Sequence, residues 1–173
     1  MNLLQIRPEE PRDYPHIRQV VSRAFETAAH SDGHEAELVG QLRDDPSYIP
    51  ALSLVAAWDG CIAGHILFSR IRIEEADEVA LALLSVSPEY QRQGIGMVLV
   101  REGHRIARAL GYGYSVVLGD PAYYAKMGYV PADTFRIYPP FCVPREHFMA
   151  VLLHAGAEPV CGQVVYGKPF GIG

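Results

Sequence analysis

Residues 84–96 read LSVSPEYQRQGIG, and this segment decides the fold. Its apolar start, which ends at Val86, predicts a buried strand, and Pro88 breaks that strand. Two glycines, Gly94 and Gly96, then stand at the start of a long segment whose apolar residues have helical spacing. The segment therefore predicts a strand, a glycine-bearing turn and a helix in direct succession.

This turn has the chemistry of an anion site. The first backbone N–H groups of a helix have no partner inside the helix, and the helix dipole favours negative charge beside them. Gly94 and Gly96 would let phosphate oxygens approach those groups, and Arg92 could add a charged contact. The spacing matches neither the G-x-G-x-x-G pattern of dinucleotide sites nor the P-loop pattern. On the residues alone, two glycines that only allow close helix packing are an equally good interpretation.

Outward from this segment, the spacing of apolar residues predicts the other elements. The expected strands are 3–7, 52–58, 62–73, 78–86, 114–118, 148–153 and 163–166, and the expected helices are 13–25 with Asp13 as its cap, 34–43, 91–110 ended by Gly111, and 121–127 ended by Gly128. Residues 131–144 are expected to be irregular. This order predicts a single α+β domain, residues 1–173, with a mixed, mostly antiparallel central sheet flanked by helices.

The composition is that of an ordinary globular protein of 173 residues, with 49% hydrophobic and 20% charged residues. The formal net charge of −5 argues against a protein that works by neutralising nucleic-acid phosphates. Three cysteines without a CxxC pair argue against a disulfide framework or a zinc site. No signal-peptide pattern and no span of membrane length are present in the sequence. We therefore expect a cytoplasmic protein that binds neither nucleic acid nor membranes.

Two motifs carry a resemblance to the GNAT acetyltransferase family. Residues 84–96 resemble motif A of that family, and residues 119–129, GDPAYYAKMGY, resemble its motif B. Residues 34–39, 148–152 and 162–170 are similar to the YhbS-like subgroup. The resemblance covers essentially the whole chain, and it implies the GNAT fold and an acetyl-CoA-dependent N-acetyltransferase.

The resemblance also implies how acetyl-CoA would be held. In this family the strand before the turn carries a bulge that splays it from the next strand, and the pantetheine arm lies in the gap. Leu84, Ser85 and Val86 would line the thioester and the pantetheine, with the Val86 amide polarising the acetyl carbonyl. The pyrophosphate would lie on a run of residues around the helix start: Gln91, Arg92, Gln93, Gly94, Ile95, Gly96 and Met97. No metal is expected.

Two proton transfers need residues of their own. Tyr124 matches the family's general acid, which protonates the departing thiolate and also contacts the cofactor. Its neighbour Tyr123 is the rival, and both could be simple packing aromatics. Glu35 is the candidate general base for the acceptor amine, ahead of Glu26 and His34. A solvated carboxylate on a helix face is the more common role for such a glutamate.

The residues are compatible with more than one acceptor and with more than one role. The acceptor is expected to be a primary amine of a small molecule or a protein, and a homodimer is compatible with the family. A domain that only binds acyl-CoA, as a sensor or adaptor, would share the cofactor motifs, but it would need no proton donor such as Tyr124. A longer acyl donor is a further alternative. His30 and His34 have metal-ligand spacing, but Gly33 interrupts the helix that they would need to share.

Overall fold

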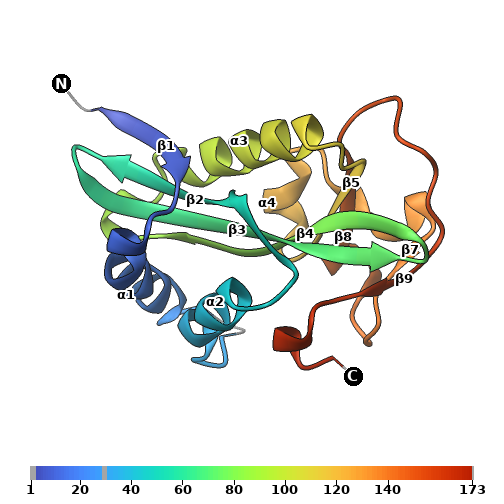
Figure 1. Cartoon of the computed structure of the whole chain (residues 1–173), viewed down its shortest axis with the longest axis horizontal. Helices are drawn as coiled ribbons and strands as arrows, with labels where there is room; N and C mark the ends of the chain where they lie inside the picture. Colours follow the sequence, from blue (N-terminus) through green and yellow to red (C-terminus); the bar gives the residue numbers. More distant parts are fainter. Residues whose placement is uncertain (1–2, 29–30, 173) are drawn as a thin grey trace.

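The computed structural model describes residues 3–28 and 31–172, and within them nine strands form one sheet (Figure 1). The main path through the sheet is β1-β2-β3-β4-β5-β8-β6, and β9 pairs with β3 and β7. The strands are β1 (Leu4–Pro8), β2 (Tyr48–Trp58), β3 (Cys61–Ile73), β4 (Ala76–Val86), β5 (Tyr114–Leu118), β6 (Val130–Pro131), β7 (Ile137–Tyr138), β8 (Phe148–Leu152) and β9 (Gly162–Val165). Only β4–β5 and β7–β9 are parallel pairs among the described strands.

The helices cover both faces of this sheet. The α-helices in the described residues are α1 (Tyr14–Phe25), α2 (Glu35–Arg43), α3 (Ile95–Ala109) and α4 (Pro121–Ala125). Helices α1 and α2 lie on one face, here called the α1/α2 face, and α3 and α4 lie on the other, the α3/α4 face (Figure 1). No helix in residues 3–28 or 31–172 is long and apolar enough to cross a membrane.

Each face of the sheet has its own apolar core, because side chains alternate along the strands. The core on the α1/α2 face consists of Ile17, Val21, Val39, Leu42, Val55, Leu67 and Leu83. The core on the α3/α4 face includes Leu54, Ile66, Phe68, Leu81, Ile95, Leu99 and Val100. The expected α+β class, with a mixed, mostly antiparallel sheet between helices, is confirmed.

Strand β4 changes its pairing halfway along its length. Its register with β3 shifts between Leu67 and Phe68, which makes Ala82 an extra residue on β4, a β-bulge. On its other side, β4 pairs with β5 only at Val79 and Ala80. After the bulge β4 therefore has a strand on one side only, and β4 and β5 diverge. We call the space between them the β4–β5 gap.

Two local predictions were wrong. The helix predicted from Gln91 begins at Ile95, because Gly94 takes a φ of +84° and a separate 3-10 turn precedes it. Asp13 stands at the N-cap of α1 but does not cap it with its side chain. Its carboxylate instead accepts hydrogen bonds from Arg7 (2.7 and 2.9 Å) and from a backbone N–H. Helical spacing shows neither a left-handed residue, as at Gly94, nor the distant partner of a side chain, as at Asp13.

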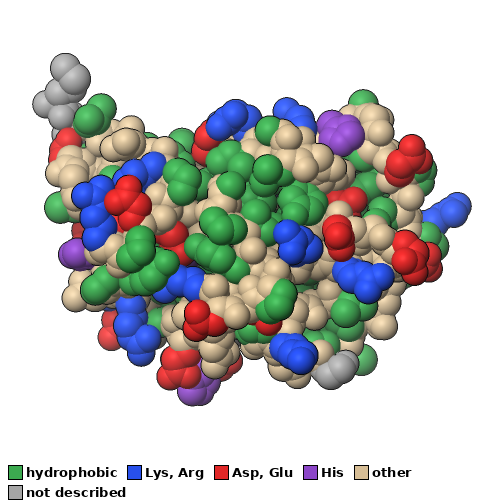
Figure 2. Space-filling model, viewed as in Figure 1, with side chains coloured by type: hydrophobic (Ala, Val, Ile, Leu, Met, Phe, Trp, Pro, Cys, Tyr) green, Lys and Arg blue, Asp and Glu red, His purple; other side chains and the backbone are tan. Residues whose placement is uncertain are grey.

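The surface carries charges of both signs. Figure 2 shows acidic and basic side chains interspersed around an exposed apolar area on the face in view. Separated charges of both signs do not build the single-sign field that steers a polyanion to a protein.

Candidate active site

The β4–β5 gap exposes peptide groups of β4. The Ser87 N–H donates to the Ala63 carbonyl on β3 (2.8 Å), and the register from there back to Leu83 is regular. Peptide groups alternate in direction along a strand, so the N–H and C=O groups of Val86 and Leu84 point away from β3 and into the gap. The Val86 N–H is therefore placed to donate to an oxygen atom in the gap.

Side-chain hydrogen bonds shape the turn that follows β4. Gln91 Nε2 donates to the Val86 carbonyl (3.0 Å), and Gln93 Nε2 donates to the Glu89 carbonyl (3.3 Å). The Glu89 carboxylate in turn binds Arg23 of α1 (2.9 Å). The side chains of the two glutamines, both predicted to hold the cofactor, thus bond to the turn itself.

Helix α3 begins without a side-chain cap. Its N-cap is Gly94, which is exposed and left-handed, and the Val98 N–H makes the first helical bond, to the Gly94 carbonyl (3.1 Å). The N–H groups of residues 95–97 consequently have no partner within the helix. Arg92, exposed and also at positive φ (62°), lies just before them. Unpaired N–H groups, the positive end of the dipole and a guanidinium together suit a phosphate.

Gly96 has a different role from Gly94. A Cβ atom at Gly96 would overlap the Tyr123 hydroxyl oxygen and would lie 3.7 Å from the Leu84 side chain. Gly96 is buried, whereas a Cβ atom at Gly94 would meet nothing within 4 Å. The structure thus gives Gly96 the packing role that the sequence left open, and it leaves Gly94 open to solvent.

Tyr124 lies beside the end of β5. Its ring covers Gly119, where a Cβ atom would be 2.5 Å from Tyr124 Cε2. It packs edge-on against Tyr123 and Tyr129, with ring centroids 5.1 and 5.6 Å away. Burial, with smaller contributions from Tyr123 and Asp120, raises the pKa of Tyr124 above its usual value. The phenol is therefore protonated at neutral pH and able to donate.

Ser85 does not join Leu84 and Val86 on the same side of β4. Leu84 and Val86 pack on the α3/α4 core, and Leu83 belongs to the core on the α1/α2 face. Alternation places the Ser85 side chain with Leu83, on the α1/α2 face. Ser85 is 2% exposed, and its hydroxyl oxygen has no hydrogen-bond partner among the described residues. Its side chain thus lies on the opposite face from those of its two neighbours.

Glu35 and Glu26 line a hollow of about 310 Å³ between the end of α1 and the start of α2. The hollow is also lined by Ser22, Phe25, Ala28, Ser31, Gly33 and Ala36. His34, at the N-cap of α2, contacts Glu37 (3.3 Å). The structure therefore brings two of the three predicted proton acceptors together.

A buried polar cluster on the α1/α2 face was missed by the sequence predictions. The Glu9 carboxylate, 1% exposed, accepts hydrogen bonds from Arg43 (2.9 and 3.0 Å) and Tyr48 (2.6 Å) and contacts His65 Nε2 (3.1 Å). Burial alone would raise the pKa of Glu9, but these hydrogen bonds hold it well below its usual range. We call these four residues the Glu9 cluster. They come from separate elements, so no local motif announces them.

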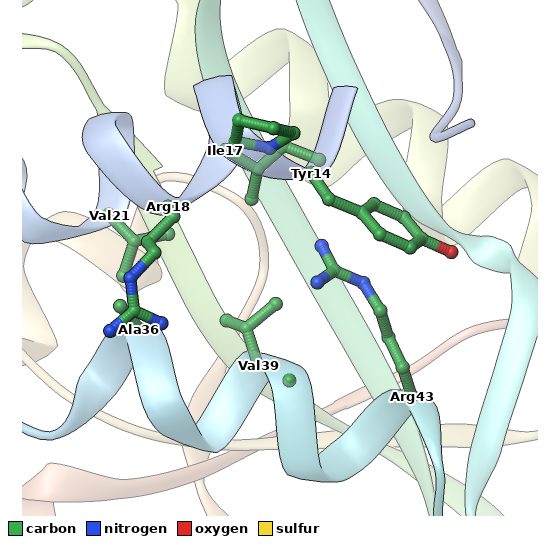
Figure 3. Close-up of a pocket in the computed structure, with 9 residues that line it drawn as sticks. Tyr14, Ile17, Arg18, Val21, Ala36, Val39 and Arg43 are labelled. Atoms are coloured by element: carbon green, nitrogen blue, oxygen red, sulfur yellow. The ribbon is translucent and has the colours of Figure 1, made fainter. Parts of the chain in front are cut away.

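Arg43 reaches from this cluster to the surface. Its guanidinium lies 3.7 Å above the centre of the Tyr14 ring, and both side chains line an open groove of about 360 Å³ between α1 and α2 (Figure 3). Ile17, Val21 and Val39 make this groove largely apolar. Neither groove nor hollow lies at the β4–β5 gap.

The described residues contain no group of three or more His, Cys, Asp or Glu side chains that could hold a metal ion. His30 lies outside the described residues, so the His30–His34 pair has no structural description.

Comparison with known proteins places this geometry in context. The chain matches the acetyltransferase (GNAT) family over residues 9–129. It is 41% identical to the uncharacterized N-acetyltransferase YjhQ of Escherichia coli K12 over 140 residues, which are 78% of this chain and 75% of YjhQ. It is 39% identical to the uncharacterized N-acetyltransferase YhbS of the same organism over 127 residues, 72% of each protein.

Two solved structures are similar over almost the whole chain. One is E. coli YhbS in complex with CoA, with a TM-score of 0.87 and 33% identity, covering 97% of this chain and 92% of that one. The other is a GNAT family acetyltransferase from Brucella melitensis in complex with acetyl-CoA, with a TM-score of 0.79 and 35% identity, covering 97% and 98%.

Proposed function

The chain belongs to the acetyltransferase (GNAT) family and is an acetyl-CoA-dependent N-acetyltransferase, and on this premise we propose that acetyl-CoA binds in the β4–β5 gap and is attacked there directly by a primary amine. The observation that carries this assignment is the open edge of β4, which ends beside the uncapped start of α3. The open edge of β4 suits an extended amide chain, and the start of α3 suits a pyrophosphate. A single turn joins the two.

The donor would bind by two kinds of contact. The amide groups of the pantetheine arm pair with the N–H and C=O groups of Leu84, as an added strand would, because the Val86 carbonyl already accepts from Gln91. The pyrophosphate accepts hydrogen bonds from the N–H groups of residues 95–97, with Arg92 beside it. Leu84 and Val86 are half-buried, so their side chains offer apolar contact on the same side of the sheet.

The chemistry then needs one donor at each end of the breaking bond. The Val86 N–H donates to the acetyl oxygen, which becomes negative as the amine adds to the carbonyl carbon. When the carbon–sulfur bond breaks, the Tyr124 hydroxyl gives its proton to the thiolate. Its raised pKa keeps that proton in place until the sulfur becomes basic.

The acceptor is proposed to be an amine that is cationic in water. Glu26 and Glu35 line one hollow and would favour a positive charge there. Glu35 is also the sequence-derived candidate for the base that takes the amine proton. A cytoplasmic location is part of the proposal, supported by Cys61, Cys142 and Cys161, which are all free and exposed.

Release of free thiol from acetyl-CoA tests the proposal. The protein is incubated with acetyl-CoA together with one amine at a time. The amines are spermidine, L-lysine methyl ester, ethanolamine, glucosamine and a peptide with a free N-terminus. We expect at least one amine to stimulate thiol release and to gain the mass of an acetyl group.

The same experiment judges the non-catalytic alternative. Calorimetry gives the affinity for acetyl-CoA in parallel. Firm binding without amine-stimulated release across a wider amine panel would favour an acyl-CoA sensor or adaptor, and absence of binding would reject the β4–β5 gap as the donor site.

A further inference from the structure

Three buried polar side chains form a hydrogen-bonded bridge between helix α3 and strand β5. The Tyr129 hydroxyl oxygen lies 2.9 Å from His104 Nε2 on α3 and 2.9 Å from Ser115 Oγ on β5. Tyr129, His104 and Ser115 are 1%, 9% and 0% exposed. We call these three residues the Tyr129 bridge. An aromatic ring that is hydrogen-bonded on two sides is held in one position, whereas a purely apolar ring can shift within a core.

The protons of the bridge have one consistent order. Burial, with a smaller contribution from the Arg108 charge, lowers the pKa of His104 to about 4, so its ring is neutral at pH 7. Ser115 has no other side-chain hydrogen bond among the described residues, so its buried hydroxyl is satisfied when it donates to Tyr129. The Tyr129 hydroxyl then donates to His104 Nε2, which is the nitrogen without a proton.

The bridge ties together elements that surround the β4–β5 gap. Its His104 end belongs to α3, whose start is the proposed phosphate site, and its Ser115 end belongs to β5, one wall of the gap. Next to His104, α3 is itself fixed on the sheet, because a Cβ atom at Gly103 would overlap the Phe68 ring of β3. Tyr129 therefore has a defined position relative to both the phosphate-binding helix and the wall of the gap.

Tyr129 in turn sets the position of Tyr124, the proposed acid. The two rings meet edge to face with centroids 5.6 Å apart, and the Tyr129 backbone N–H donates to the Tyr124 carbonyl (3.3 Å). Within residues 3–28 and 31–172, no hydrogen bond holds the Tyr124 hydroxyl itself. Packing on Tyr129, Tyr123 and Gly119 consequently decides where that hydroxyl lies.

We propose that His104 and Ser115 are positioning residues, which act through Tyr129 to hold the Tyr124 hydroxyl within reach of the departing thiolate. The inference rests on the proposed function, in which Tyr124 gives its proton to the sulfur as the carbon–sulfur bond breaks. The bridge adds no proton-transfer step, because the Tyr129 hydroxyl bonds to His104 and Ser115 and acts on geometry alone. A displacement of about 1 Å at a reacting group can lower a rate by up to about 100-fold.

His104→Leu and His104→Gln separate positioning from packing. Leucine fills the site but offers Tyr129 no acceptor, whereas glutamine keeps an amide oxygen for that hydroxyl. With the panel amine that is turned over fastest, kcat should fall roughly 10-fold in His104→Leu, while the Kd for acetyl-CoA stays within about 2-fold. His104→Gln should keep kcat within about 3-fold of the parent protein. Equal kcat for the two variants, or a change confined to Kd, would overturn the proposal.

Tyr129→Phe tests whether the bridge acts through Tyr124. It removes the shared hydroxyl and keeps the ring, so kcat should fall about 10-fold in the parent protein but less than about 2-fold in Tyr124→Phe, which has no proton to position. Tyr48→Phe is the matched control and should leave kcat unchanged, because it also removes a hydrogen-bonded hydroxyl (2.6 Å to Glu9), on the opposite face of the sheet. An equal fall caused by Tyr129→Phe in both backgrounds would indicate a general structural role and would contradict the proposal.

Ser115→Ala tests the other end of the bridge and replaces His104→Leu if that variant does not fold. It removes one oxygen atom from the middle of β5 and with it the donor to Tyr129, and kcat should fall about 3-fold or more. Ser69→Ala is its control, because Ser69 on β3 is also fully buried but has no hydrogen-bond partner among the described residues. Equal kcat for the two serine variants would count against the bridge.

A readout without turnover completes the test. Aromatic carbon-13 NMR of the tyrosine rings, with Tyr124 assigned from the Tyr124→Phe variant, reports on the acid directly. The aromatic contacts of His104 are with Phe68 and Tyr129, so an effect of His104 on Tyr124 has to pass through Tyr129. His104→Leu should shift or broaden the Tyr124 signal, and His104→Gln should not. An unchanged Tyr124 signal in His104→Leu overturns the proposal even if every amine in the panel is inactive, an outcome that concerns the proposed function instead.

Discussion

The two ends of β4 differ in what satisfies their peptide groups. At the closed end, Val79 and Ala80 pair with β5, and one oxygen of the Glu78 carboxylate accepts the N–H groups of Gly113 and Tyr114, both at 2.8 Å. At the open end, after the bulge, the Leu84 peptide groups and the Val86 N–H face a gap, and only the Val86 carbonyl has a partner, the Gln91 side chain. The protein satisfies its own backbone at one end and leaves it for a ligand at the other.

This difference separates stability from function along one strand. Buried backbone groups must be paired, so the closed end should be sensitive to the loss of any acceptor. The open end contributes little pairing of its own, so changes there should affect the ligand more than the fold. Substitutions at the two ends can therefore be compared directly.

The largest effect is expected at the open end, from Gly94→Val. Valine at a φ of +84° is strained and would place a branched side chain over the N–H groups of residues 95–97. The affinity for acetyl-CoA should fall roughly 1,000-fold, about 4 kcal/mol, as measured by calorimetry.

Gly111→Val is the control for this change. Gly111 ends the same helix, has a φ of +95°, and has open space around it as Gly94 does. Both variants should lose about 1–3 kcal/mol of stability through the same strain. If the two variants lose comparable affinity for acetyl-CoA, the loss comes from strain in α3 in general. The start of α3 would then not be the phosphate site.

Tyr124→Phe should have the next largest effect, and on chemistry alone. Removing the hydroxyl leaves the ring packed on Gly119 and Tyr129 but removes the proton for the thiolate. We expect kcat to fall about 100-fold with an unchanged Kd for acetyl-CoA. Tyr123→Phe is the matched variant on the same helix and should change kcat less than about 3-fold. If the two results are exchanged, Tyr123 is the acid.

At the closed end, Glu78→Leu should reduce the free energy of unfolding by about 2 kcal/mol, because it leaves two buried N–H groups without an acceptor. Burial raises the pKa of Glu78, which means that the buried charge is itself unfavourable. Removing that charge therefore offsets part of the lost free energy of unfolding. Glu78→Gln keeps a carbonyl oxygen for both N–H groups and should stay close to the parent protein. Urea unfolding gives the stabilities. A large fall in the affinity of folded Glu78→Leu for acetyl-CoA would show that the two ends are coupled.

These two ends were not equally predictable from the sequence. The open end follows from local signals: an apolar strand, a proline, and glycines before an amphipathic helix. Glu78 gave no signal, because its partners Gly113 and Tyr114 lie 35 and 36 residues away. The Glu9 cluster stayed hidden for the same reason. Long-range pairing of a buried side chain depends on the fold, and periodicity describes only neighbours along the chain.

Helix starts and glycine roles show a second limit. Helical spacing placed the helix start at Gln91, because spacing cannot show where a backbone first turns left-handed, as it does at Arg92 and Gly94. It also treated Gly94 and Gly96 alike. Their difference depends on Tyr123, which comes from another helix. The directions of the Val86 peptide and the Ser85 side chain likewise became visible only with the register of β3 and β4.

The smallest expected effect lies at the contact between α3 and α4. Gly96→Ala should gain up to about 1 kcal/mol of helix propensity but lose about as much or more, because the new methyl group displaces the Tyr123 hydroxyl. In the double variant with Tyr123→Phe, that hydroxyl is gone and the ring carbon Cζ lies 3.7 Å from the new Cβ, an ordinary contact. The double variant should therefore be more stable than the sum of the single changes by about 1 kcal/mol, measured by thermal unfolding of all four proteins. Strict additivity would mean that α4 moves freely over the start of α3. If the two changes are coupled in stability but leave the Kd for acetyl-CoA unchanged, Gly96 serves the packing of α4 on α3. Gly94 then remains the glycine of the ligand site.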